Sequence, residues 1–297
     1  MKHILTALFI LALATLACNL PLSTPVPAPT ASPPTETVRL SDHSDAPLPP
    51  TQSPVLDTPA PEFPGQPVTY DRLSLVLPAK LASGGTGQSF PRAEGENIGP
   101  WEITPGHIAV TFIGYTLPDT FHTARIYVFP AEEYAALFEG AEGSINRLRS
   151  IFAAPNAPVA AENLPFIPFF NAGAQFSAQI QRIEFQNGAG VRFLTQYGQD
   201  VSPINNRSMF YQFQGLTSDG NSYVIAILPV NHPALPADYD SPTPPGGIPF
   251  PDTSDPNADF MGYYEQVGQL LDTSTESTFT PNLETLDLLI QSIQVTP

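Results

Sequence analysis

The stretch SMFYQFQGLTSDGNSYVIAILPV, residues 208–230, places two β-rich runs on either side of the turn segment TSDGN. Glycine and asparagine tolerate the backbone angles of tight turns, so this pattern predicts a β-hairpin. Apolar residues line both faces of its second run: Tyr223, Ile225 and Ile227 on one face, and Val224, Ala226 and Leu228 on the other. A strand with two apolar faces is expected inside a sheet that is covered on both sides.

A second hairpin precedes the first. AQFSAQIQRIEFQ, residues 174–186, and VRFLTQYGQ, residues 191–199, flank the turn signal Asn187-Gly188-Ala189-Gly190. The two hairpins together predict a four-stranded antiparallel meander over residues 174–230.

The rest of the pattern predicts strands before the meander and helices around it. We expect a strand over 68–81, a loop over 82–100, strands over 107–117 and 122–129, and a helical region over 130–152 broken near Gly140 and Gly143. Two later helices are expected to open at Asp255-Pro256 and Thr280-Pro281, with each pair serving as N-cap and first helical residue. The predicted fold class is α+β, a mostly antiparallel sheet flanked by helices in a sandwich-like arrangement.

The first 67 residues of the chain have a different composition. Residues 19–67 are rich in proline, threonine and serine and have no periodic apolar face, which predicts a disordered linker. Ahead of it, MKH and the apolar run ILTALFILALATLA are typical of an export signal and are shorter than the about 20 apolar residues of a membrane span. We therefore expect a signal peptide over 1–17, a tether over 18–67 and a single globular domain over 68–297.

Cys18, the only cysteine of the chain, lies at the end of this signal in the segment TLAC. The segment resembles the bacterial lipobox, with Thr15 where leucine is usual, and this resemblance implies that Cys18 is lipidated. The alternative is ordinary cleavage after Ala12-Leu13-Ala14, which would leave a free thiol. A lone cysteine has no intramolecular disulfide partner, so lipidation is the hypothesis that gives it a role. The expected location is the extracytoplasmic face of the cell membrane, held by the lipid.

The element order also resembles known families. A strand, a helical pair, the meander ending in GLTSDGNSYVIAILPV and the final amphipathic LETLDLLIQSI are similar to uncharacterised secreted bacterial lipoproteins with a Pro/Thr-rich tether, and remotely to the PsbP-like α/β/α sandwich. The resemblance covers residues 68–297. It implies an extracytoplasmic binding or assembly role and supplies no catalytic set.

Charge and missing motifs narrow the function classes. The formal net charge is −17, which disfavours binding to nucleic acid. The sequence contains no G-x-S-x-G nucleophile motif and no phosphate loop, and His107, His122 and His232 lack metal-ligand spacing, so we expect no catalytic residue, cofactor or metal. Carboxylates of Glu132, Glu133 and the acidic loop 238–259 could still converge as an acid–base pair or as a cation site.

The candidate contact residues are aromatic. Phe166, Phe169 and Phe170 occur in the proline-broken segment NLPFIPFFNAG, which is either a core plug or an exposed patch for a partner or ligand. Trp101 is a further candidate for stacking. The leading hypothesis is a non-catalytic binding module with an unidentified protein or ligand partner, displayed on a tether; the alternative is an extracellular hydrolase of glycan-type substrates that uses paired carboxylates.

Overall fold

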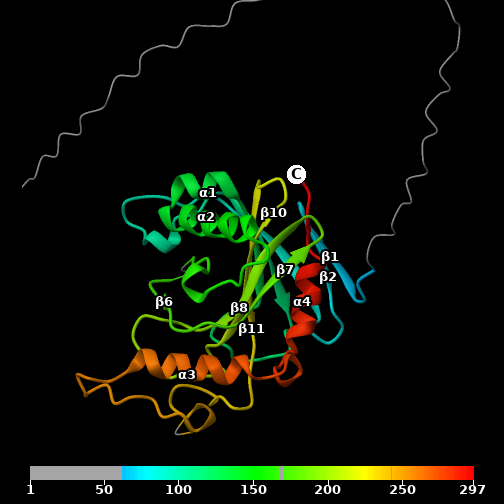
Figure 1. The fold of residues 1–297 in the computed structure, drawn as a ribbon. Coiled ribbons are helices and arrows are strands. Elements are labelled where there is room, and N and C mark those ends of the chain that lie inside the picture. The colour runs from blue at the N-terminus through cyan, green and yellow to red at the C-terminus, as the bar shows by residue number, and fades with distance from the viewer. Residues whose placement is uncertain (1–61, 168–169, 242) are drawn as a thin grey trace, which may run out of the picture. The chain divides into compact units, whose positions relative to one another are not determined.

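The main feature of the fold is a seven-stranded antiparallel sheet with the strand order β3-β4-β5-β11-β10-β8-β7 (Figure 1). The computed structural model describes residues 62–167, 170–241 and 243–297. The strands are β3 Gly84–Phe90, β4 His107–Ile113, β5 Arg125–Pro130, β7 Ala178–Phe185, β8 Gly188–Thr195, β10 Phe210–Thr217 and β11 Ser222–Pro229. The predicted meander β7-β8-β10-β11 is present and forms one half of this sheet.

Smaller elements surround the main sheet. Three strands form a second antiparallel sheet, β1 Gln66–Tyr70, β2 Leu73–Leu77 and β12 Gln294–Val295, and two more form a short pair, β6 Gly173–Ala174 and β9 Tyr197–Gly198. The α-helices in the described residues are α1 Ala131–Leu137, α2 Glu139–Ala153, α3 Phe260–Asp272 and α4 Leu283–Gln291. The α+β prediction with a mostly antiparallel sheet is thus confirmed. No helix among the described residues has the length and apolarity to cross a membrane.

Side chains of the sheet pack into a separate core on each face. On the first face, here called the α4 face, Tyr211, Phe213, Val224, Ala226 and Leu228 pack with residues of α3, α4 and the three-stranded sheet. On the opposite face, the α2 face, Val191, Phe193, Phe210, Tyr223, Ile225 and Ile227 pack with α1, α2 and the segment 164–167. Every residue of β11 is buried, as the two apolar faces of the second run predicted, and every residue of β10 is buried as well.

Two predicted elements near the N-terminal edge are wrong. The single strand expected over 68–81 is a hairpin, because the chain turns at Asp71, whose φ is 52°. The loop expected over 82–100 begins with the edge strand β3. Glycine is usually depleted in strands, but here its missing side chain is required, since a Cβ at Gly87 would overlap the ring of Tyr70 on β1.

The helix and turn boundaries also differ from the sequence pattern. The break in the helical region lies at Phe138, whose backbone is extended, and both Gly140 and Gly143 lie inside α2. In the meander, Gly188 already pairs with Phe185, so the first hairpin turns at residues 186–187, one residue earlier than expected.

Both C-terminal helices begin later than the proline signals predicted. The Asp255 carboxylate accepts from the Asn257 N–H at 2.8 Å and so closes a local turn instead of capping a helix. Helix α3 is capped by Asp259, which accepts from the Gly262 N–H at 2.8 Å. Helix α4 is capped by Asn282, which accepts from the Glu284 N–H at 2.9 Å, and the preceding Thr280–Pro281 peptide is cis.

Candidate functional site

The predicted contact residues divide into those the structure describes and those it does not. Cys18 and the rest of residues 1–61 lie outside the described residues, and so does Phe169. The predictions that rest on them, which are the signal peptide, the lipid anchor, the tether and one aromatic contact, therefore stay predictions.

Phe166 and Phe170 are half-buried against the α2 face. The Phe166 ring lies 5.1 Å from the ring of Tyr197, and its backbone N–H donates to Ser144 Oγ at 3.0 Å. Phe170 lies 5.6 Å from the ring of Phe121, which is 57% exposed. Phe166 and Phe170 therefore mainly cover the core. The exposed ring beside them is Phe121, which the sequence pattern did not single out.

Amide and hydroxyl groups hold this cover in place. Gln214 on β10 donates to the Pro165 carbonyl at 3.2 Å, and the Tyr197 hydroxyl contacts Gln212 Oε1 at 2.9 Å and the Ile167 carbonyl at 3.3 Å. Buried polar groups are stable when they are paired in this way. The polar side chains of β10 on this face thus have a structural role in seating the segment 164–167.

Trp101 lies elsewhere. It is half-buried in the short 3₁₀-helix Pro100–Glu102, and among the described residues it makes no ring contact with Phe166 or Phe170. Of the predicted aromatic residues that the structure describes, Trp101 thus does not join Phe166 and Phe170 in one platform.

The acidic loop 238–259 uses its carboxylates locally. Asp238 accepts from the Asp240 N–H at 3.1 Å, and Asp252 accepts from the Ser254 N–H at 2.9 Å. Asp255 and Asp259 make the turn and cap already described. Within the described ranges, no group of three or more His, Cys, Asp or Glu residues is arranged to hold a metal ion.

Each of the three histidines in the described residues, His107, His122 and His232, packs against an aromatic ring. His107 lies 4.4 Å from Phe129 and its Nδ1 is 2.9 Å from the Pro105 carbonyl. His122 lies 4.4 Å from Phe210, and burial lowers its pKa to about 4, so it is neutral at pH 7. His232 contacts Phe279 on the α4 face, with ring centroids 4.7 Å apart. Their contacts are those of core residues.

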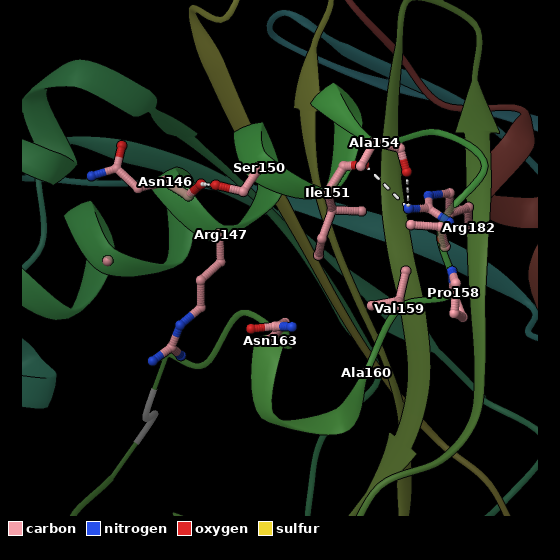
Figure 2. A pocket seen from close by; sticks show the side chains of 12 residues that line it. Asn146, Arg147, Ser150, Ile151, Ala154, Pro158, Val159, Ala160, Asn163 and Arg182 are labelled. Carbon is pink, nitrogen blue, oxygen red and sulfur yellow. Dashed lines mark hydrogen bonds between the residues drawn. The ribbon is translucent and has the colours of Figure 1, made fainter.

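A cavity of about 370 Å³ lies between helix α2 and the chain that follows it (Figure 2). We call it the α2 pocket. Its lining combines polar and apolar side chains from α2, from the chain beyond it and from β7: Gly143, Asn146, Arg147, Ser150, Ile151, Ala154, Ala157, Pro158, Val159, Ala160, Asn163 and Arg182. The volume lies at the lower end of the range of roughly 300–1,000 Å³ that is typical of small-molecule sites.

Arg182 on β7 frames one side of the pocket. Its guanidinium donates to three carbonyls, those of Ile151 at 3.1 Å, Ala154 at 3.0 Å and Ala157 at 2.6 Å. The last carbonyls of a helix have no partner within the helix, and a cation is favourable at this negative end. Arg182 therefore both caps α2 and attaches the following chain to the sheet.

Arg147 frames the other side. Its side chain is exposed, and its Nη1 donates to the Leu164 carbonyl at 3.1 Å. Figure 2 shows Arg147 and Asn163 on one side of the pocket, with Pro158, Val159 and Arg182 on the other. Ser150, one turn along α2, donates to the Asn146 carbonyl at 2.9 Å.

The pocket is a local exception to the charge of the chain. Its lining includes two arginines and no Asp, Glu, His or Cys, although the whole sequence carries 28 acidic residues against 11 basic ones. This arrangement can bind a ligand by hydrogen bonds and apolar contact, and it supplies no acid–base pair. The sequence contains little signal for the pocket: Arg147 and Arg149 are near each other in a chain that has few basic residues, but Arg182 is distant from both in the sequence.

Comparison of the chain with protein-family models, curated proteins and solved structures gave no significant match. The resemblance to secreted lipoproteins and to the PsbP-like sandwich stays a prediction.

Proposed function

We propose that this chain is a lipid-anchored, extracytoplasmic binding module with no catalytic activity, and that the α2 pocket is its ligand site. The observation that carries the binding function is the lining of the pocket, which presents arginine, amide and apolar groups without a carboxylate or histidine. The export signal and the TLAC segment support the location.

The chemistry of the pocket supports binding over hydrolysis. A glycan hydrolase that uses two carboxyl groups needs both of them beside the scissile bond. The α2 pocket has none in its lining. In the acidic loop, Asp238, Asp252 and Asp259 accept hydrogen bonds within their own turns. We therefore favour a module that presents its ligand or partner at the membrane surface.

The location is tested with the variant Cys18→Ser, expressed in a bacterium that processes lipoproteins. The wild type is expected to incorporate labelled fatty acid and to fractionate with membranes, because stable anchoring needs more than one acyl chain and a lipidated cysteine supplies them. Cys18→Ser should lose both properties. Label that persists in the variant would contradict the anchor.

The ligand site is tested in the same full-length protein by a ligand-observed NMR screen of small molecules. Gly143→Phe is the blocking variant, since nothing lies within 4 Å of a Cβ at this lining position. Ala153→Phe, at an exposed residue of α2 outside the lining, is the matched control. Hits should be lost in the first variant and kept in the second; hits that survive Gly143→Phe would move the site elsewhere.

A further inference from the structure

We propose that the α2 pocket binds a small amphiphilic monocarboxylate, with its carboxylate at Arg147 and its apolar part against Ile151 and Val159. This inference rests on the proposed function of the pocket as a ligand site. It is derived from the balance of hydrogen-bond donors, apolar surface and charge in the lining.

Donors are in excess on the Arg147 side of the pocket. Among the described residues, the Arg147 guanidinium has one hydrogen-bond partner, the Leu164 carbonyl at Nη1. Its Nη2 and Nε remain as donors. A guanidinium presents its N–H groups in a planar fork that matches the two oxygens of a carboxylate. The exposed side chain of Arg147 can therefore receive a carboxylate without breaking its existing bond.

Two amide side chains add to this excess. The Asn146 Oδ1 accepts from Arg149 at 3.4 Å, which leaves the amide N–H groups of Asn146 as donors. Asn163 ends the 3₁₀-helix Ala161–Asn163 beside Arg147, and its side-chain amide has no hydrogen-bond partner among the described residues. The lining of the α2 pocket has no carboxylate. Glu139 and Glu142 line the adjoining hollow, which shares Asn146 and Arg147 with the pocket, but among the described residues neither glutamate forms an ion pair with Arg147.

The rest of the pocket is suited to hydrocarbon. Ile151, Ala154, Pro158 and Val159 contribute aliphatic surface, and Figure 2 shows Ile151 and Val159 between the two arginines. Contact with such surface stabilises a bound CH₂ group by the hydrophobic effect. A ligand with one charged end and a short apolar body matches both parts of the lining.

Charge distinguishes a monocarboxylate from other ligands. Arg182 already faces three carbonyls at the negative end of α2, so much of its charge is opposed. One guanidinium, that of Arg147, is left to balance the ligand, and the net charge of −17 disfavours a dianion such as a phosphate monoester. A cation finds no acidic partner in the lining.

The test uses isothermal titration calorimetry on the full chain in detergent, with hexanoate, hexanamide, hexylamine and inorganic phosphate as probes. Hexanoate should bind at least about tenfold more tightly than the other three, because a charge-assisted hydrogen bond is about twice as strong as a neutral one. Arg147→Gln should weaken hexanoate binding by about tenfold. Arg207→Gln removes the same charge from an exposed position outside the lining and should change it by less than about twofold.

Other results of the titrations would separate a failure of the carboxylate inference from a failure of the proposed ligand site. Equal binding of hexanoate and hexanamide, both lost in Gly143→Phe, would overturn the carboxylate inference and leave the proposed ligand site intact. Hexanoate binding that is equally weakened by Arg147→Gln and Arg207→Gln would show attraction by the charge of the protein alone and would also overturn it. Binding of hexanoate that survives Gly143→Phe, or no binding of any probe, would reject both the inference and the use of this pocket by amphiphiles of this size.

Discussion

The two faces of the seven-stranded sheet hold their covers by different chemistry. On the α4 face, the buried Arg192 of β8, 1% exposed, contacts Glu276 at 2.6 Å and Asp287 of α4 at 3.5 Å. Tyr211 donates to the same Asp287 carboxylate at 2.8 Å. On the α2 face, the bonds between the sheet and the segment 164–167 come from neutral groups, the amide of Gln214 and the hydroxyl of Tyr197.

This difference affects where the molecule can hold a ligand. Charged side chains on the α4 face bind one another, and a buried charge must keep its partner. On the α2 face, the amide of Gln214, the hydroxyl of Tyr197 and the guanidinium of Arg182 all bind backbone carbonyls, so none of these bonds is a charge pair. The α2 pocket lies at the end of α2, where Arg182 joins the helix to the following chain.

The largest effect is expected from a substitution that removes the ion pairs of Arg192 on the α4 face. Arg192→Met removes the cation that faces Glu276 and Asp287, and should lower the free energy of unfolding by about 3–5 kcal/mol at pH 7, because it leaves the buried Asp287 carboxylate without its cation. Urea denaturation measures this loss. The exposed Arg149→Met on α2 is the control and should change stability by no more than about 0.5 kcal/mol. A loss below about 1 kcal/mol for Arg192→Met would show that the α4 face does not depend on its charges.

A second prediction uses pH to separate the faces. Burial lowers the pKa of His122, on the α2 face, from 6.5 to about 4, and burial raises the pKa of Asp287, on the α4 face, from 3.8 to about 6 although Arg192 opposes the shift. Between the native and the unfolded pKa of His122, the unfolded chain holds a proton on this residue that the native state lacks, so His122 makes the free energy of unfolding rise with pH. Between the unfolded and the native pKa of Asp287, the native state holds a proton on this residue that the unfolded chain has released, so Asp287 makes the free energy of unfolding fall with pH.

The two slopes oppose each other in the wild type and are separated by substitution. Asp287→Asn should make the slope of stability against pH between about pH 4.5 and 5.5 more positive, and His122→Phe should make it more negative, each by up to about 1.4 kcal/mol per pH unit. Urea denaturation at several pH values measures both slopes. His107 and His232 are common to both variants and cancel. Slopes that change in the same direction would reject the assignment of opposite behaviour to the two faces.

The smallest effect is expected from adding a methyl group to a helical glycine on each face of the sheet. Gly143 lies inside α2 with nothing within 4 Å of an added Cβ, whereas a Cβ at Gly268 of α3, on the α4 face, would lie 3.3 Å from the Ser177 carbonyl oxygen. Gly143→Ala should raise the free energy of unfolding by about 0.5–1 kcal/mol, since alanine loses less conformational entropy in a helix. Gly268→Ala should gain less or lose stability. Thermal unfolding compares them, and the reverse order would contradict the looser cover of the α2 face.

Much of the sheet was predictable and little of the pocket was. The runs around TSDGN and Asn187-Gly188 are strongly patterned, and local pattern is sufficient where apolar faces and turn residues agree. The lining of the pocket combines Arg147 of α2, Asn163 of a 3₁₀-helix and Arg182 of β7. No spacing in the sequence relates these three residues, because the contacts that join them depend on how the chain folds back.

The sequence by itself determined the meander, which follows from its turn residues, and the burial of both faces of β11 and the helical character of both C-terminal segments, which follow from the pattern of apolar residues. Only the tertiary structure decided that the glycine-rich residues 84–90 form an edge strand, that α3 is capped by Asp259, and that two arginines frame one pocket. The physical reason is the same in each case. A glycine, an aspartate or an arginine has several local conformations of similar energy, and a partner from elsewhere in the chain selects among them. For Gly87 that partner is the Tyr70 ring, for Asp259 it is the Gly262 N–H, and for Arg182 it is the carbonyls at the end of α2. These partners reach their positions only when the surrounding chain has packed.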